Sequence, residues 1–236
     1  GPPGLWAIAF SPDGTRLAMG SQGGIAQVWD AQTGEPVGKV MRQDGSMQVV
    51  VFSPDGQSVA IASQGLGTSL GVTRIWDYAS GQVVGPTFRH PNGNAWTVAF
   101  SPSGSILATG SDDGTARLWD IATGSLVAPP MRHDGFVFQI QFSPDGRLLA
   151  TASQDGTVGL WSAVTGEPVL QPLPHSGGVS HVAFSTDSRL LAAGEDNGTV
   201  SIWDMGTITR LAAPLPHQGA VHGLDFGPGG DLLISS

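Results

Sequence analysis

The stretch SDDGTARLWD occupies residues 111–120, and two close copies follow it, SQDGTVGLWS at 153–162 and EDNGTVSIWD at 195–204. The copies begin 42 residues apart. Each has a turn of the Asp-Gly or Asn-Gly kind, and such turns suit the positive φ angles of a tight β-hairpin. A run ending in Trp follows each turn. The stretch therefore predicts a hairpin that is built again at a fixed interval, which is typical of repeat architectures.

One complete unit, residues 137–171, shows what surrounds the hairpin. In order it contains the strand VFQIQF, the turn SPDG, the strand RLLATAS, the turn QDG, the strand TVGLW, the loop SAVTGE and the strand PVLQPL. Proline and glycine stand where such turns need them, and helical periodicity is found nowhere. Four antiparallel strands in about 42 residues are typical of one blade of a β-propeller.

The same unit can be followed along the whole chain by its aromatic residues. The repeated Phe residues are spaced by 42, 48, 42, 42 and 42 residues, and the irregular spacing comes from extra residues at 64–72 and near 90–94. The recurring residues are Phe10, Phe52, Phe100, Phe142, Phe184 and Phe226, with Trp29, Trp76, Trp119, Trp161 and Trp203. We expect one repeat domain, 1–236, made of units at about 4–43, 44–90, 91–133, 134–175, 176–217 and a partial unit at 218–236.

The ends of the third strands carry a family resemblance. Trp-Asp pairs stand at Trp29-Asp30, Trp76-Asp77, Trp119-Asp120 and Trp203-Asp204, while the fourth unit departs with Trp161-Ser162. With DGT before the third strand and His ahead of a new unit, the chain resembles the WD-repeat β-propeller family over essentially its whole length. The resemblance implies an all-β propeller with five full repeats and half of a sixth, cut from a ring of seven or more blades. TolB-like propellers, which share FSPDG, are the alternative, but the Trp-Asp ending argues against them.

Groups of Ser, His and Asp recur and could be taken for catalytic triads. The resemblance implies instead a structural tetrad, in which Asp fixes His and a Ser links it to the Trp indole. A catalytic triad is normally made once per protein, whereas this set occurs twice, and buried polar groups need such partners. The two predicted tetrads are His90, Ser111, Asp113 and Trp119, and His133, Ser153, Asp155 and Trp161. Gln43, Asn197 and Glu195 replace members of the set elsewhere.

Composition excludes several classes of function. The net charge is −9 with Lys39 as the single lysine, so we expect no nucleic-acid partner, because duplex binding needs clustered Lys and Arg. The chain has no cysteine, which fits a reducing, cytoplasmic location, and no apolar run reaches the length of a membrane helix. One His per blade makes a poor metal cage. We therefore expect no metal, no cofactor and no membrane contact.

Positions that vary between units are the candidates for binding. Two residues before each repeat Phe the side chain is always apolar, from Ile8 to Leu224, and is expected in the core. Four residues before, the side chain varies freely, and the two Trp residues outside the repeat pattern fall there. The varying residues are Trp6, Gln48, Trp96, Phe138, Ser180 and His222, with Phe136 close by, and the resemblance implies neighbouring rim positions at Gln22, Gln64, Asp112, Gln154 and Asp196. Aromatic rings among amides and carboxylates favour a peptide-binding mouth; the alternative is that these rings only pack between blades.

These observations predict a non-catalytic scaffold that binds a protein or peptide on the top face of the propeller. The two carboxylates at the rim and the acidic net charge favour a partner with basic residues. Two alternatives stay open. One is a sensor or regulatory array joined to other domains of a larger bacterial signalling protein, such as a kinase, nucleotide hydrolase or protease, and the other is an enzyme propeller, for which no unrepeated catalytic set is visible.

Overall fold

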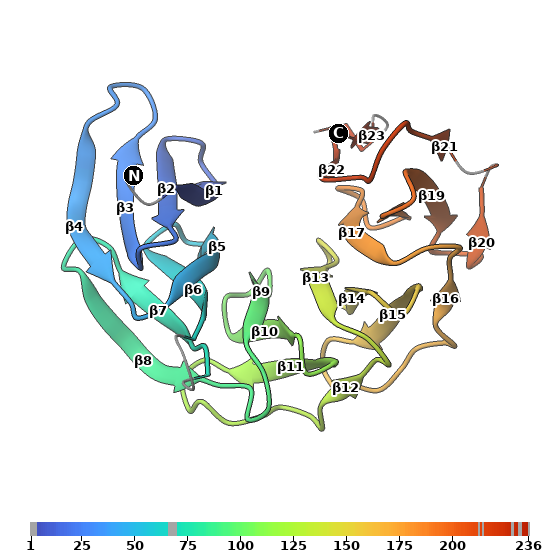
Figure 1. Cartoon of the computed structure of the whole chain (residues 1–236), viewed down its shortest axis with the longest axis horizontal. Helices are drawn as coiled ribbons and strands as arrows, with labels where there is room; N and C mark the ends of the chain where they lie inside the picture. The colour runs from blue at the N-terminus through green and yellow to red at the C-terminus, as the bar shows by residue number, and fades with distance from the viewer. Residues whose placement is uncertain are drawn as a thin grey trace. The chain divides into compact units, whose positions relative to one another are not determined.

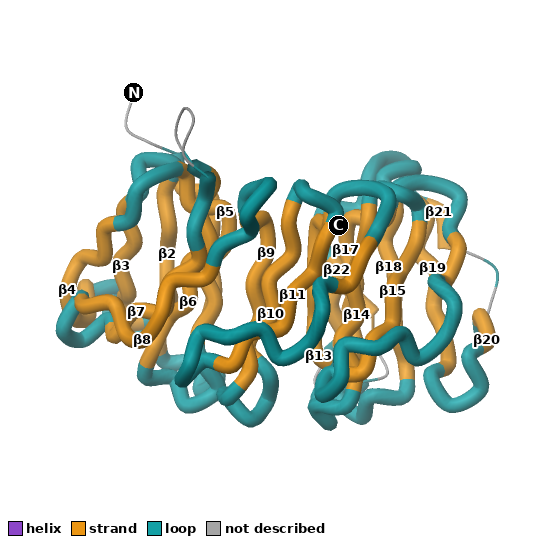
Figure 2. The backbone as a smooth tube through the Cα atoms, turned by 90° about the horizontal axis from the view of Figure 1, so that it is seen from below, coloured by secondary structure: helices purple, strands orange, loops and turns teal. Residues whose placement is uncertain are grey.

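The structure is a computed structural model that describes residues 4–65, 70–211, 213, 215–227, 229–230 and 233–235. Every regular element among them is a β-strand, as Figure 2 shows, and this confirms the expected all-β class. No described helix is long and apolar enough to cross a membrane. The number of blades in a closed ring stays a prediction.

The chain divides into two compact units, the first made of residues 1–113 with 117–127 and the second of 114–116 with 128–236. The first unit contains two complete antiparallel sheets, in the strand orders β1-β2-β3-β4 and β5-β6-β7-β8, and most of a third (Figure 1). Its strands are β1 (Leu5–Phe10), β2 (Arg16–Ser21), β3 (Ile25–Asp30), β4 (Pro36–Arg42), β5 (Ser46–Phe52), β6 (Ser58–Gln64), β7 (Thr73–Asp77), β8 (Gln82–Phe88), β9 (Ala95–Phe100), β10 (Ile106–Ser111) and β11 (Thr115–Asp120), whose first two residues belong to the second unit.

The second unit continues the same strand pattern. β12 completes the third sheet by pairing with the first residues of β11, and the sheets β13-β14-β15-β16 and β17-β18-β19-β20 follow, with β21 also paired to β19. Its strands are β12 (Met131–Arg132), β13 (Val137–Phe142), β14 (Leu148–Ser153), β15 (Thr157–Ser162), β16 (Leu173–Pro174), β17 (Val179–Phe184), β18 (Leu190–Glu195), β19 (Thr199–Asp204), β20 (Thr209–Arg210), β21 (Leu215–Pro216), β22 (Leu224–Phe226) and β23 (Leu233–Ser235).

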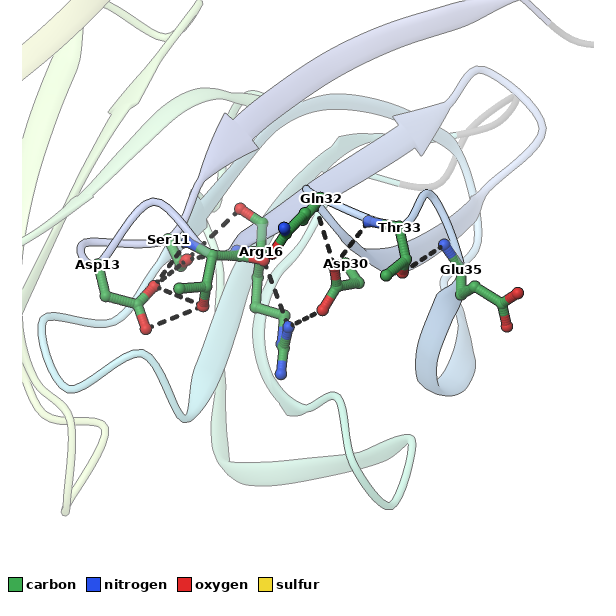
Figure 3. Close-up of polar contacts among 8 residues, drawn as sticks. Ser11, Asp13, Arg16, Asp30, Gln32, Thr33 and Glu35 are labelled. Carbon is green, nitrogen blue, oxygen red and sulfur yellow. Dashed lines mark hydrogen bonds and ion pairs between the residues drawn. The ribbon is translucent and has the colours of Figure 1, made fainter.

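The SPDG turns form because their side chains bond to their own backbone. In the first turn the Ser11 hydroxyl donates to the Asp13 carboxylate (2.6 Å) and accepts from the Arg16 amide (2.9 Å), as Figure 3 shows. The bond from the Ser11 hydroxyl, with those from the Thr15 amide and hydroxyl, lowers the pKa of Asp13 to about 2. Gly14 takes a positive φ of 71°, which glycine adopts without strain. The Arg16 side chain pairs with Asp30 across the hairpin.

The core of the first unit lies between neighbouring sheets. Ala18 and Val28 of the first sheet pack against Val50 of the second, and all three are buried. The expected core position is wrong for Ile8, which stands at the place of Val50 but is 59% exposed, and Phe10 beside it is 64% exposed. Within the first unit, no described element packs on that face of the first sheet.

Glutamine side chains join two sheets of the second unit. The side-chain oxygen of Gln139 on β13 accepts from the backbone amide of Val182 (2.7 Å), and that of Gln141 accepts from Phe184 (2.8 Å). Both amides belong to β17, the first strand of the next sheet. The two glutamines therefore satisfy backbone donors on the open edge of that strand.

Candidate functional site

Five of the six varying positions, those in β1, β5, β9, β13 and β17, are β-bulges. In β13, Val137 pairs with Ser153 and Gln139 pairs with Ala152, so that Phe138 is left out of the ladder. The residues skipped in the same way in the other first strands are Trp6, Gln48, Trp96 and Ser180. A bulged residue is unpaired and its side chain is re-aimed, which explains why these positions are free to vary. His222 lies just before β22, outside the described ladder.

In the first unit the bulge residues are partly covered. Trp96 is half-buried, and its indole Nε1 is buried without a hydrogen-bond partner among the described residues. Gln48 is half-buried and donates from Nε2 to the carbonyl of Ser46 (3.2 Å). Of the rim residues, Gln22 is exposed and Gln64 is half-buried. The side chain of Trp6 lies outside the described part of the structure.

Asp112, expected at the rim, is engaged inside the protein. One of its carboxylate oxygens accepts from the Asn94 amide (2.7 Å) and the other from the Asn94 side-chain nitrogen (3.0 Å). The side-chain oxygen of Asn94 in turn accepts from the amides of Gly65 (3.0 Å) and Gly71 (2.9 Å). The two insertions that break the repeat spacing, at 64–72 and 90–94, are thus bonded to each other through Asn94.

The second unit carries an exposed aromatic pair. Phe136 is 42% exposed and Phe138 is 37% exposed, and their rings stand edge to face with centroids 6.4 Å apart. The carbonyl of Phe136 accepts from the backbone amide of Gln154 (2.9 Å), which fixes the pair beside that exposed residue. Exposed aromatic pairs of this kind are suited to contact with a partner.

Asp196 lies on the other side of Gln154. A Cβ atom built at Gly178 would be 2.9 Å from an Asp196 carboxylate oxygen and 3.4 Å from the Gln154 carbonyl, so the two residues flank this glycine. Asp196 is exposed, and its carboxylate accepts no hydrogen bond from any described residue. Ser180 differs, since its hydroxyl bonds to the carbonyl of Val221 (2.9 Å); His222 is exposed.

The tetrads contain a threonine where a serine was expected. His90 Nε2 lies 2.8 Å from the Thr109 hydroxyl, the Trp119 indole donates to that hydroxyl (2.8 Å), and His90 Nδ1 faces Asp113 at 3.4 Å. Ser111 accepts a bond from the Asp113 amide instead (3.0 Å). The predicted role of Ser111 is therefore wrong, because the residue two places earlier on β10 is the one level with the indole.

The second tetrad has the same correction. Thr151, and not Ser153, lies 2.6 Å from His133 Nε2 and accepts from the Trp161 indole (2.9 Å), while His133 Nδ1 is 3.1 Å from Asp155. Ser153 accepts from the Asp155 amide (3.2 Å).

Each set brings a hydroxyl, an imidazole and a carboxylate into the order of a catalytic triad, but the hydroxyls are buried. Thr109 and Thr151 are fully inaccessible to solvent, so no substrate can reach either oxygen. Burial lowers the pKa of His90 and of His133, against the opposing effects of Asp113 and Asp155. Neutral imidazoles accepting from a buried hydroxyl stabilise the sheets.

Two sheets depart from this arrangement. In the second sheet Gln43 occupies the histidine position, and Trp76 donates directly to its side-chain oxygen (3.2 Å). In the fifth sheet Ala193 stands where Thr151 stands in the fourth. As a result His175 Nε2 and Trp203 Nε1 are both buried without a hydrogen-bond partner in the part of the chain that the structure describes. Within that part, no group of three His, Cys, Asp or Glu residues could hold a metal ion.

Comparison with known proteins assigns the repeat. The family model described as "WD domain, G-beta repeat" (WD40) matches residues 1–30, 83–120, 124–162 and 166–204, which is more than half of the chain. The chain belongs to the WD40 repeat family. Among solved structures, this WD40 chain is similar to the crystal structure of the computationally designed Ika8 protein, with a TM-score of 0.82 and 25% identity over 98% of this chain and 67% of that one.

Curated relatives of this WD40 chain are matched over part of its length. U3 small nucleolar RNA-associated protein 18 of Saccharomyces cerevisiae is 34% identical over 41% of the chain and 17% of the relative. WD repeat-containing protein SL1-17 of Schistosoma mansoni is 34% identical over 48% and 35%, and the Periodic tryptophan protein 2 homolog of Dictyostelium discoideum is 27% identical over 45% and 11%. The chain thus covers between 11% and 35% of these relatives.

Proposed function

We propose that this WD40 chain is a non-catalytic scaffold that binds a protein or peptide segment with basic side chains at the bulges of its first strands. The observation that carries the proposal is the exposed pair Phe136 and Phe138 beside Gln154, whose carbonyl flanks Gly178 together with the unengaged carboxylate of Asp196. Membership of the WD40 family supports a scaffold role in general, and the buried hydroxyls of the tetrads argue against catalysis.

The chemistry of this surface in the second unit suits a cationic side chain. A guanidinium or ammonium group over an aromatic face gains about 0.5–2 kcal/mol, depending on how far it is desolvated. The Asp196 carboxylate supplies an acceptor for its N–H groups, and charge-assisted bonds of this kind are the stronger ones. The net charge of −9 adds long-range attraction for a basic segment.

The carboxylate of Asp112 in the first unit is less suited to a cation. Asp112 is already bonded to Asn94 by both oxygens. We therefore assign the cation preference to Asp196 rather than to Asp112.

The experiment measures binding of two pools of short peptides, one rich in Arg and Lys and one of equal length rich in Glu and Asp. We expect the chain to bind the basic pool only. Phe138→Ala should weaken that binding by on the order of 2 kcal/mol, as for a buried aromatic anchor at an interface. Asp196→Asn should weaken it less and reduce its dependence on salt, since it removes a charge at the rim.

Two control variants separate binding from folding. Val164→Ala truncates another exposed apolar side chain, 73% accessible, in the loop after β15, and should leave binding unchanged. Trp161→Ala removes a buried residue of the same sheet as Phe138 and should lower the free energy of unfolding by about 3–5 kcal/mol. If Phe138→Ala destabilises the chain as much as Trp161→Ala, the aromatic pair belongs to the core and the proposal fails. Equal binding of both peptide pools would also contradict it.

A further inference from the structure

The chain contains two Asn-Gly sequences, and the structure treats them very differently. Asn92-Gly93 lies in the turn before β9, and Asn197-Gly198 forms the hairpin turn between β18 and β19. Both asparagines are exposed. We propose that Asn92 is a site of spontaneous deamidation, and that hydrogen bonds protect Asn197 from the same reaction.

The reaction needs no enzyme and uses only water. The backbone nitrogen of the following glycine attacks the side-chain carbonyl carbon, a C–N bond forms, and the side-chain nitrogen leaves as ammonia. Water then opens the resulting five-membered imide at either carbonyl, which gives aspartate or isoaspartate. Glycine favours the attack because no Cβ atom obstructs the approach to its backbone nitrogen.

Asn197 is held away from this geometry. Its side-chain nitrogen donates to the Ser176 hydroxyl and to the Glu195 carboxylate, each at 3.0 Å, and its side-chain oxygen accepts from the Thr199 amide (2.9 Å). The attacking nitrogen is engaged too, because the Gly198 amide donates to the carbonyl of Glu195 (3.2 Å). Reaction at this site would require several bonds to break first.

Asn92 has none of these restraints. Its side chain makes no hydrogen bond to any described residue, and the Gly93 amide likewise has no acceptor among them. The side chain is therefore free to rotate into the attacking position. In addition, glycine is required at 93, because a Cβ atom there would lie 2.2 Å from an Asp112 carboxylate oxygen. The fold thus requires the glycine that makes the Asn92-Gly93 sequence reactive.

The isoaspartate product would disturb the insertions described above. In isoaspartate the main chain runs through the former side-chain methylene, so the backbone before Gly93 becomes longer by one atom. Gly93 is already wedged against Asp112 and Ser111, and the next residue is Asn94, which bonds to Asp112, Gly65 and Gly71. The extra atom would displace Asn94 from these partners, whereas ordinary aspartate at 92 would only add an exposed charge.

The test follows both sites by peptide mass spectrometry during incubation of the folded chain in mildly alkaline buffer, and again in denaturant. We expect Asn92 to react several-fold faster than Asn197 in the folded chain. In denaturant the two rates should become similar, because both sites have the same Asn-Gly sequence and the hydrogen bonds of the fold are lost. Ser176→Ala should raise the rate at Asn197, and Asn92→Gln should remove the fast product. Equal rates in the folded chain, or a faster reaction at Asn197, would overturn the proposal.

A second measurement tests the consequence for the fold. The isoaspartate form, separated by chromatography, should melt at a lower temperature than the untreated chain, while the variant Asn92→Asp should melt as the untreated chain does. Identical melting of all three forms would overturn the inferred link between residue 92 and Asn94.

Discussion

Ala193→Thr should stabilise the fifth sheet by supplying the hydroxyl that the third and fourth sheets already have. His175 Nδ1 faces the carbonyl of Leu173 at 3.0 Å, so Nδ1 carries the proton and Nε2 is an acceptor. Trp203 Nε1 is a donor, and both atoms are buried without partners among the described residues. A threonine hydroxyl at 193 would donate to His175 Nε2 and accept from Trp203 Nε1, as the Thr151 hydroxyl does with the equivalent atoms of the fourth sheet.

The size of the effect follows from two new hydrogen bonds. Each is worth about 1 kcal/mol net, so we expect a gain of about 2 kcal/mol from the hydroxyl. In a chain of this size that gain raises the melting temperature by roughly 4–8 °C. The gain is to be measured by thermal and chemical denaturation.

The steric cost of the larger side chain needs its own control. In the fourth sheet Gly159 stands near Thr151, and a Cβ atom at Gly159 would lie 2.6 Å from the Thr151 hydroxyl, while the fifth sheet has Ser201 at that place. Ala193→Val has the shape of threonine without the hydroxyl and carries the same steric cost. The difference in stability between Ala193→Thr and Ala193→Val, each alone and each combined with Ser201→Gly, gives the contribution of the hydroxyl. If the two variants are equally stable in both backgrounds, our account of the tetrads is wrong.

Three other outcomes can be measured on the same chain. Thr151→Val should lower the free energy of unfolding by about 1–3 kcal/mol, since it leaves His133 Nε2 and the Trp161 indole nitrogen unpaired. Stability should fall as the pH drops below about 6.5, the unperturbed pKa of histidine. Burial lowers the pKa of His133 in the folded chain, so the unfolded chain binds the proton first. His133→Gln should flatten this dependence of stability on pH, and an unchanged slope would contradict the prediction. Gln43→Leu should cost a similar amount by removing the acceptor of the Trp76 indole, and urea denaturation that shows no loss would argue against that bond.

The strands and their turns could be predicted from the sequence because they depend on neighbouring residues. Asp-Gly and Pro-Asp-Gly turns carry their own backbone preferences, and the alternation of the strands marks two faces. The variation between repeats at Phe138 and its equivalents also marked this position of the first strand as outside the core. The structure explains the variation, because the residue lies in a β-bulge.

Other features depend on residues far apart in the chain. Thr109 and Ser111 lie on the same face of β10, two residues apart, and only the position of the Trp119 indole decides which hydroxyl it meets. The bond between Asn94 and the glycines at 65 and 71 joins two insertions with no sequence pattern in common. The hydrogen bonds between Asp112 and Asn94 belong to the same network and could not be predicted from the sequence either.

At Gln139 and Gln141, side-chain oxygens of one repeat accept hydrogen bonds from main-chain amides of the next. Any residue except proline can supply the amides that they need. The side chains required for these two bonds therefore all lie in the repeat that carries the glutamines, and side-chain changes in the next repeat leave the backbone donors in place. In an array that grows by duplication, bonds of this kind would let a copied repeat pack against the repeat with the glutamines before its own side chains have diverged.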